Sequence, residues 1–325
     1  MNQKLQQLFP GFLLSVVVGS VVMLLSSFLQ TSHSILLGLL AGILINNFYV
    51  IPAKFQDGIS FTSGKMLEIS VVLLAFGINY NHIAKIGFSN FLIVILTVFL
   101  VLFFTMFLSK KMKCPRSVGW LVGFGTAICG SSAIAALAPT VAKDKEDIAV
   151  SMAVVNLYGT LGMLLLPLLV TLFQMSEVDA CLLLGGTLHS VGNVAGAGYA
   201  VSETIGSNAL TIKLARVAML TPGLILFNYL LRSHQNQKVS YWNLPWYLIA
   251  FLVISTLVSY VSFPKEILDF SNQLGKIILT IAMVAIGLKI KFKTLWESGK
   301  RGLLFGAIVF GAMLIFLFTL LFLIN

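Results

Sequence analysis

The chain has 325 residues, of which 58% are hydrophobic and only 10% are charged, and its formal net charge is +10. Because soluble domains carry about 25% charged residues, this composition excludes a soluble globular protein. Three cysteines without a C-x-x-C pair and only four histidines argue against a disulfide framework and a structural zinc site. We expect no metal and no cofactor.

Apolar stretches long enough to cross a bilayer, which takes roughly 17–25 residues, recur along the chain. We place about eleven of them, at 11–30, 34–51, 66–80, 89–109, 118–139, 148–173, 180–200, 209–231, 244–262, 272–290 and 301–324. No small-residue cleavage site follows the first stretch, so we expect a retained span rather than a signal peptide. The sequence therefore predicts an all-α integral membrane protein of the cell membrane.

The basic residues predict the orientation of these spans. With a cytoplasmic N-terminus, fourteen of the 21 basic residues fall on the cytoplasmic side: Lys4, Lys54, Lys65, Lys110, Lys111, Lys113, Arg116, Arg232, Lys238, Lys289, Lys291, Lys293, Lys300 and Arg301. The positive-inside rule then places the N-terminus in the cytoplasm and the C-terminus outside. This rule accounts for the positive charge, so we expect no nucleic acid partner.

Two pairs of similar segments, called echoes below, suggest that the chain consists of two related halves. Residues 64–80, GKMLEISVVLLAFGINY, resemble 275–290, GKIILTIAMVAIGLKI, and a polar linker and a long apolar stretch follow each. By the count above, the two segments run in opposite directions, as in an inverted-topology repeat.

The second echo pairs 125–136, GTAICGSSAIAA, with 186–197, GTLHSVGNVAGA. We interpret each as Gly-Thr at a helix start, then a small and polar break, then Ala and Gly. Glycine destabilises a helix interior by roughly 1 kcal/mol relative to alanine, so these segments predict discontinuous helices that line a polar cavity. The two segments are separated by a single span, so they run parallel unless that count is wrong or one break is re-entrant.

Polar residues in and near the breaks are the candidate ligands. A helix that restarts at Gly130 directs free N–H groups and the positive end of its dipole into the cavity, which favours an anion. No carboxylate lies in 125–135 or 186–197, the place where cation exchangers carry acidic pairs. The predicted substrate-binding set is Thr126, Gly130, Ser131, Ser132, Asn156, His189, Gly192, Asn193 and Arg216.

Each candidate has a structural alternative. The serines, Asn156 and His189 fit hydrogen-bonded helix packing as well as a binding site. Arg216 either attracts the anion or snorkels to the interface, and snorkelling is the favoured interpretation of Lys213. Glu68 is the candidate for carrying a coupling proton, with an interfacial pair to Lys65 as the favoured alternative.

These segments also carry a family resemblance. GTAICGSSAIAALAP, AVSMAVVNLYGTLGMLLLPLL, GGTLHSVGNVAGAGYAVS, TIKLARVAML and LTIAMVAIGLKI resemble the YeiH-type membrane proteins, to which sulfate export is attributed. The chain departs from the usual family pattern at Ser190, Gly192 and Asn193. The resemblance implies a fold related to the bile-acid, arsenite and auxin-type carriers, with a panel domain and a core with two crossing broken helices. It places one crossover at Gly130, Ser131 and Ser132 and the other at His189, Gly192 and Asn193.

The combined expectation is a secondary active transporter of a small anion, with sulfate or a sulfonate as first guess, working by elevator-like alternating access. We expect one membrane domain with a panel at 1–62 and 240–264 and a core at 63–232 and 265–325. Its partners are the bilayer, the anion and, as one possibility, a second copy in a homodimer. The alternatives are a cation- or proton-coupled transporter of small organic acids and an intramembrane hydrolase with Cys129, Ser131 or Ser132 as nucleophile and His189 as base. We expect no enzymatic activity.

Overall fold

The computed structural model of the protein describes residues 2–28, 34–77, 88–112, 115–231, 246–290 and 300–324. Every regular element within these ranges is a helix, which confirms the expected all-α fold. Seven helical stretches in the described part are long and apolar enough to span a membrane: Gln7–Phe28, Ala53–Gly77, Ser89–Lys111, Lys145–Leu172, Glu203–Phe227, Lys265–Gly287 and Gly302–Leu323. Shorter apolar helices cover Ser34–Phe48, Ser131–Val141 and Trp246–Tyr260.

The chain forms two compact units. Unit 1 comprises Met1–Ile83, Tyr199–Ser207 and Trp246–Phe292, and unit 2 comprises Ala84–Gly198, Asn208–Pro245 and Lys293–Asn325. The described helices of unit 1 are α1 (Asn2–Phe28), α2 (Ser34–Phe48), η1 (Ala53–Phe55), α3 (Gln56–Phe61), η2 (Thr62–Met66), α4 (Leu67–Leu74), η3 (Ala75–Gly77), α14 (Trp246–Tyr260) and α15 (Lys265–Gly287). Those of unit 2 are α6 (Phe88–Lys111), α7 (Arg116–Ala127), α8 (Ser131–Val141), α9 (Lys145–Leu172), α10 (Glu177–Thr187), α13 (Leu220–Leu231) and α17 (Lys300–Ile324). Two helices, α11 (Val191–Val201) and α12 (Glu203–Ala218), contribute residues to both units.

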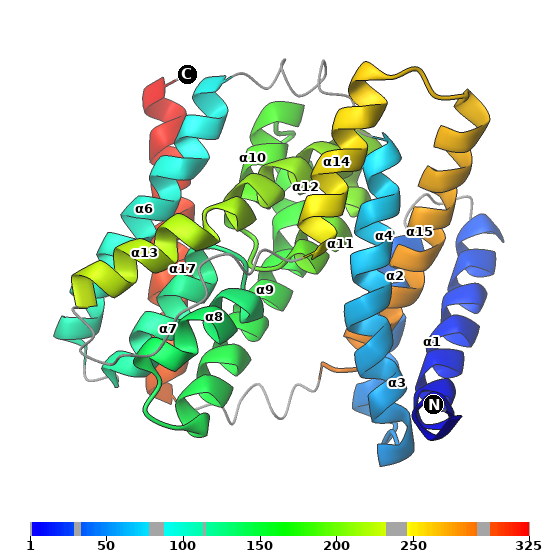
Figure 1. Ribbon diagram of the computed structural model, residues 1–325, viewed down its shortest axis with the longest axis horizontal. Helices are drawn as coiled ribbons and strands as arrows, with labels where there is room; N and C mark the ends of the chain where they lie inside the picture. Colours follow the sequence, from blue (N-terminus) through cyan, green and yellow to red (C-terminus); the bar gives the residue numbers. More distant parts are fainter. Residues whose placement is uncertain are drawn as a thin grey trace. The chain divides into compact units, whose positions relative to one another are not determined.

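Unit 1 is built around α15, which packs against α2 and α4 (Figure 1, orange and blue). Gly42 of α2 and Gly287 of α15 approach so closely that a Cβ on either would meet the backbone of the other helix. Small residues allow such close helix contacts where no water drives association. Near the same end, the amides of Asn46 and Asn47 donate to the Ile290 carbonyl at 3.2 and 2.9 Å.

The third expected span begins earlier than the sequence predicts. It runs from Ala53 to Gly77 and contains a π-helical turn at Thr62–Met66. Thr62 donates its hydroxyl to the Gly58 carbonyl at 2.8 Å. Polar residues at 54–65 hid this part of the helix, because they interrupt the apolar run on which the prediction rested.

The division into units differs from the expected panel and core. The sequence groups 63–80 and 265–290 with the core, whereas α4 and α15 pack with α1 and α2 in unit 1. The glycine contacts between α2 and α15 are the physical reason, since they join an N-terminal helix to a helix expected in the core. Which unit acts as panel and which as core stays a prediction.

Unit 2 supports the two expected breaks. α17 packs beside α6, and both contact α7 (Figure 1, red and cyan). Gly306 of α17 lies against Val154 and Tyr158 of α9, and the Tyr158 hydroxyl donates to the Leu303 carbonyl at 2.8 Å. These long helices hold α7 and α9, and α7 leads directly into the first break.

Candidate functional site

Both segments of the second echo are broken helices. The first is interrupted between Ala127 and Ser131, where Gly130 has φ +76°, and the second between Thr187 and Val191. Only glycine adopts such a positive φ at no steric cost, which explains its use at the first break. At the second break the Ser190 hydroxyl accepts the Asn193 N–H at 3.1 Å, as an N-cap does.

The Gly-Thr pairs expected to start helices instead end them. Gly125 and Thr126 lie in the last turn of α7, and Gly186 and Thr187 end α10. The expectation was wrong because glycine and threonine occur at both ends of helices. Whether a Gly-Thr pair starts or ends a helix depends here on whether the backbone carbonyls after the pair are capped. The sequence alone does not show that capping.

The chain bends sharply at the first break. Residues nine positions apart in a continuous helix lie about 13 Å apart along its axis. Here a Cβ built on Gly125 would come within 2.9 Å of the Ile134 side chain, so α8 folds back toward α7. This bend favours the re-entrant alternative for the first break over a straight crossing helix.

The two breaks lie against each other. A Cβ built on Gly130 would stand 3.4 Å from the His189 carbonyl oxygen. The Lys213 ammonium bridges them, because it donates to the carbonyls of Ile128 and Leu188, each at 2.7 Å. Unit 2 therefore gathers both breaks and α12 at one point.

Arg216 holds the same point from the next turn of α12. Its Nε and Nη2 donate to the Ala127 carbonyl at 3.2 and 2.9 Å, and Nη2 also donates to Thr126 at 2.7 Å. Its Nη1 donates to the carbonyls of Gly185 and Leu188 at 3.3 and 3.0 Å. These contacts use all five guanidinium N–H groups. The geometry favours a structural role for Arg216 over direct contact with an anion.

Both cations cap helix C-termini. The last carbonyls of a helix lack intrahelical partners and carry the negative end of its dipole. Lys213 and Arg216 satisfy these carbonyls at the ends of α7 and α10 and are both completely buried. The snorkelling interpretation of Lys213 is therefore wrong: the side chain turns inward because two sets of free carbonyls attract it.

Neither buried cation has an acidic partner within the described ranges. The ion pairs in the described part of the chain are Lys65–Glu68 and Lys276–Glu203, and neither involves α12 residues 213 or 216. In the described part of the chain, backbone carbonyls rather than carboxylates therefore stabilise the two cations. Carbonyl dipoles do not neutralise a formal charge, so a net positive charge remains that attracts an anion in a low-dielectric setting.

The start of α8 carries two of the predicted ligands, Ser131 and Ser132, and a third, Asn156, lies on α9 beside them. The Ser131 hydroxyl donates to Oδ1 of Asn156 on α9 at 3.0 Å, which brings these two candidates together. Ser132 lies 2.9 Å from the Cys129 sulfur and hydrogen-bonds the Cys129 carbonyl at 3.3 Å. Ser132 and Asn156 are both exposed, so they remain available to a ligand.

His189 and Asn193 form the second half of the predicted set. His189 is 1% exposed, its ring lies 5.0 Å from the Phe310 ring, and both of its nitrogens lack a hydrogen-bond partner. The Asn193 amide fills the space that a Cβ on Gly159 would occupy. A buried imidazole without a partner is an unusual feature that calls for an explanation, and a bound ligand is one.

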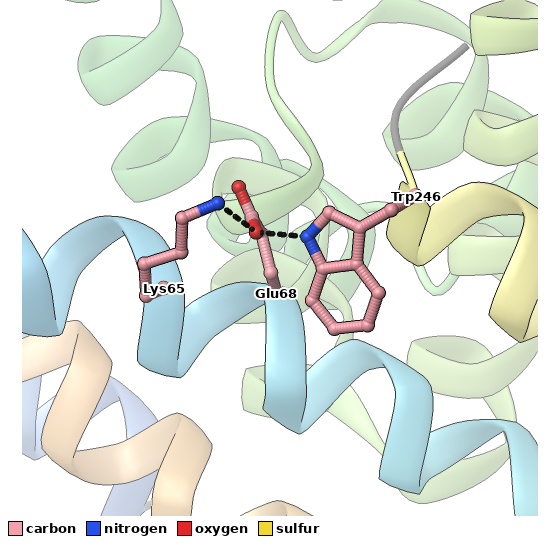
Figure 2. A network of polar contacts seen from close by, with 3 residues as sticks. All are labelled: Lys65, Glu68 and Trp246. Carbon is pink, nitrogen blue, oxygen red and sulfur yellow. Dashed lines mark hydrogen bonds and ion pairs between the residues drawn. The ribbon is translucent and has the colours of Figure 1, made fainter.

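The remaining predicted residues separate into two groups. Thr126 takes part through its carbonyl, as described above, and Gly192 is buried in the first turn of α11. Glu68 belongs to unit 1, whereas the other predicted residues belong to unit 2. Its Oε2 accepts from Lys65 Nζ at 2.9 Å and from Trp246 Nε1 at 2.6 Å (Figure 2). The expected Lys65 pair is therefore present, and the coupling role of Glu68 stays a prediction.

The sequence missed Lys213, Gly159 and Phe310 as parts of this site. The spacing of Lys213 and Arg216 at i, i+3, with no acid nearby, was the available signal for a shared function. The hydrolase alternative gains no geometric support, because His189 hydrogen-bonds none of Cys129, Ser131 and Ser132.

Comparison with known proteins places this architecture in a family. The family model described as "Conserved hypothetical protein 698" matches residues 10–306. The chain is 32% identical to the UPF0324 membrane protein YdhF of Lactococcus lactis, over 92% of this chain and 93% of the relative. It is 31% identical to the UPF0324 membrane protein TauZ of Paracoccus pantotrophus, over 91% and 89% of the two chains.

A further relative is the UPF0324 inner membrane protein YeiH of Salmonella typhimurium, 29% identical over 94% of this chain and 91% of the relative. No solved structure matches the chain significantly. These names agree with the apolar helices in describing a membrane protein. On the family match and the near full-length identities, the chain belongs to the Conserved hypothetical protein 698 (UPF0324) family of membrane proteins.

Proposed function

We propose that this protein is a secondary active transporter of a small anion, with sulfate or a sulfonate as the first substrates to test. One observation carries the proposal: the two helix breaks meet at a pair of buried cations that have no acidic partner among the residues that the structure describes. Transporters commonly bind substrate near the bilayer midplane between discontinuous helices.

The proposed anion site lies at the starts of α8 and α11. Each of these half-helices begins at a break, so its first N–H groups lack intrahelical acceptors and form the positive end of a dipole. Ser131, Ser132 and Asn193 are near these ends and provide neutral donors. His189 offers a further donor, because neither of its nitrogens is engaged.

The energy source proposed is an ion or substrate gradient, since the sequence contains no Walker A motif. Alternating access would follow from an elevator-like movement of the unit that carries the breaks. In this scheme Lys213 and Arg216 keep the two breaks together while they move, and the substrate is bound by the starts of α8 and α11.

The test is uptake of radiolabelled sulfate and of a small sulfonate by purified protein in liposomes. We expect the double variant Ser132→Leu/Asn193→Leu to lose uptake while its melting temperature stays near that of the natural protein. The matched control Ser20→Leu/Thr256→Leu changes two exposed positions and should transport normally. Normal uptake by the Ser132/Asn193 variant would refute the site assignment.

The alternative, a cation- or proton-coupled transporter of small organic acids, is separated in the same assay. Uptake of small carboxylates in preference to sulfate and sulfonate, driven by an imposed proton or sodium gradient, would favour it. Uptake of sulfate or sulfonate without such a preference supports the anion transporter proposed here.

A further inference from the structure

The Lys213 ammonium occupies a position with the features of a cation site. It is completely buried and donates to two backbone carbonyls, those of Ile128 and Leu188. Each carbonyl belongs to the residue directly after a half-helix, α7 in one case and α10 in the other. Both are therefore oxygens at the negative end of a helix dipole.

Such oxygens bind free cations in other transporters. Carbonyls of unwound backbone and the C-terminal ends of half-helices coordinate coupling cations in transporters with discontinuous helices. In this chain the two N–O distances are both 2.7 Å, within the range for charge-assisted hydrogen bonds. A side chain of the protein thus provides the charge that a free cation provides elsewhere.

We propose that Lys213 is a tethered occupant of a monovalent-cation site between the two breaks. The site itself favours a positive charge, because two helix ends converge there, and the Lys213 ammonium supplies it from the chain itself. Removal of the ammonium would leave a site that a free organic ammonium, Na⁺ or K⁺ enters. A consequence, which rests on the proposed transport function, is that transport uses no metal cation at the breaks.

Arg216 does not take over this role. Its donors are directed to Thr126, Ala127, Gly185 and Leu188, and the Ile128 carbonyl is bound by Lys213. Loss of Lys213 therefore leaves the Ile128 oxygen without a donor and removes one of two donors from Leu188. This gap between the breaks is the site that an added cation would fill.

The experiment is chemical rescue of Lys213→Ala. This substitution removes Cγ, Cδ, Cε and Nζ, the atoms that propylammonium contains. We expect purified Lys213→Ala to melt below the natural protein, and propylammonium chloride to raise its melting temperature in proportion to the logarithm of concentration. Tetramethylammonium chloride at equal ionic strength should have no such effect, because it cannot donate hydrogen bonds.

Two controls make the rescue specific. Lys213→Met retains most of the side-chain volume without the charge, so propylammonium should not stabilise it. Lys276→Ala removes a cation that pairs with Glu203 and is partly exposed, and it should also show no rescue. If Lys213→Ala does not fold, propylammonium present during purification should recover folded protein. If propylammonium, Na⁺ and K⁺ neither raise the melting temperature of Lys213→Ala nor recover folded protein during purification, the proposal is overturned.

The consequence for coupling has its own measurement. Sulfate uptake by the natural protein should be equal in sodium and choline media. A requirement for sodium would overturn the inference that transport uses no metal cation at the breaks. If no anion is transported at all, the proposed function fails, while rescue of the melting temperature still supports the tethered-cation site.

Discussion

We expect Arg216→Met to lower the free energy of unfolding far more than the substitution of an exposed cationic side chain does. The substitution keeps an unbranched apolar side chain, shorter than that of arginine, and removes all five donors. Leu188 retains Lys213 as a partner, so the carbonyls left without a donor are those of Thr126, Ala127 and Gly185. These oxygens lie at helix C-termini and have no intrahelical partner to return to.

The expected magnitude follows from these three carbonyls. A buried polar group without a hydrogen bond costs about 1–3 kcal/mol, so the total is roughly 3–9 kcal/mol. With about 2 °C lost per kcal/mol, the melting temperature should fall by more than about 6 °C. Because whole proteins are stable by only about 5–15 kcal/mol, the upper end of this range would abolish folding.

The assay is thermal unfolding of the purified protein in detergent, with the yield of monodisperse protein as a second measurement. Lys65→Met is the control, since that side chain is 57% exposed and forms one pair with Glu68. A surface pair contributes about 0–1 kcal/mol, so the control should change little. A fall of under about 2 °C for Arg216→Met would refute the capping argument.

Other substitutions test the remaining parts of the description. Gly159→Ala should displace the Asn193 amide and reduce anion uptake several-fold with little loss of stability, because the displaced atoms end a flexible side chain; unchanged uptake would count against Asn193 as a ligand. Gly42→Ala should lower the melting temperature through contact with the α15 backbone, whereas Gly311→Ala, which has open space, should be neutral or stabilising, and equal effects would contradict the packing argument. Glu68→Gln retains an oxygen for Trp246 and should leave the pH profile of uptake unchanged; a lost pH dependence would instead assign proton coupling to Glu68.

The sequence predicts the helical membrane fold and both breaks because composition and small-residue clusters are local signals. Gly130 with its neighbouring serines, and Ser190 with Gly192, mark positions where a continuous helix is unfavourable. The roles of Lys213 and Arg216 could not be predicted in the same way. The Lys213 partners are 85 and 25 residues away in the chain, and periodicity does not reveal contacts at such separations.

The grouping of helices is hidden from the sequence for a similar reason. The contact between Gly42 and Gly287 joins distant parts of the chain through backbone atoms. Glycine leaves no apolar side chain whose pattern would indicate the contact. The extension of the third span to Ala53 was missed because its π turn carries polar residues within a helix.

The proposed preference for an anion rests on which helix ends the protein satisfies with its own side chains. Each break creates a negative C-terminal end and a positive N-terminal end. Lys213 and Arg216 occupy the negative ends of α7 and α10, so a substrate cation would find neither free carbonyls there nor a carboxylate among the described residues beside them. The positive ends of α8 and α11 are bordered by neutral groups, and the nearby charge is positive. This pattern of satisfied and unsatisfied helix ends is the physical basis on which we propose an anion as the ligand of the two breaks.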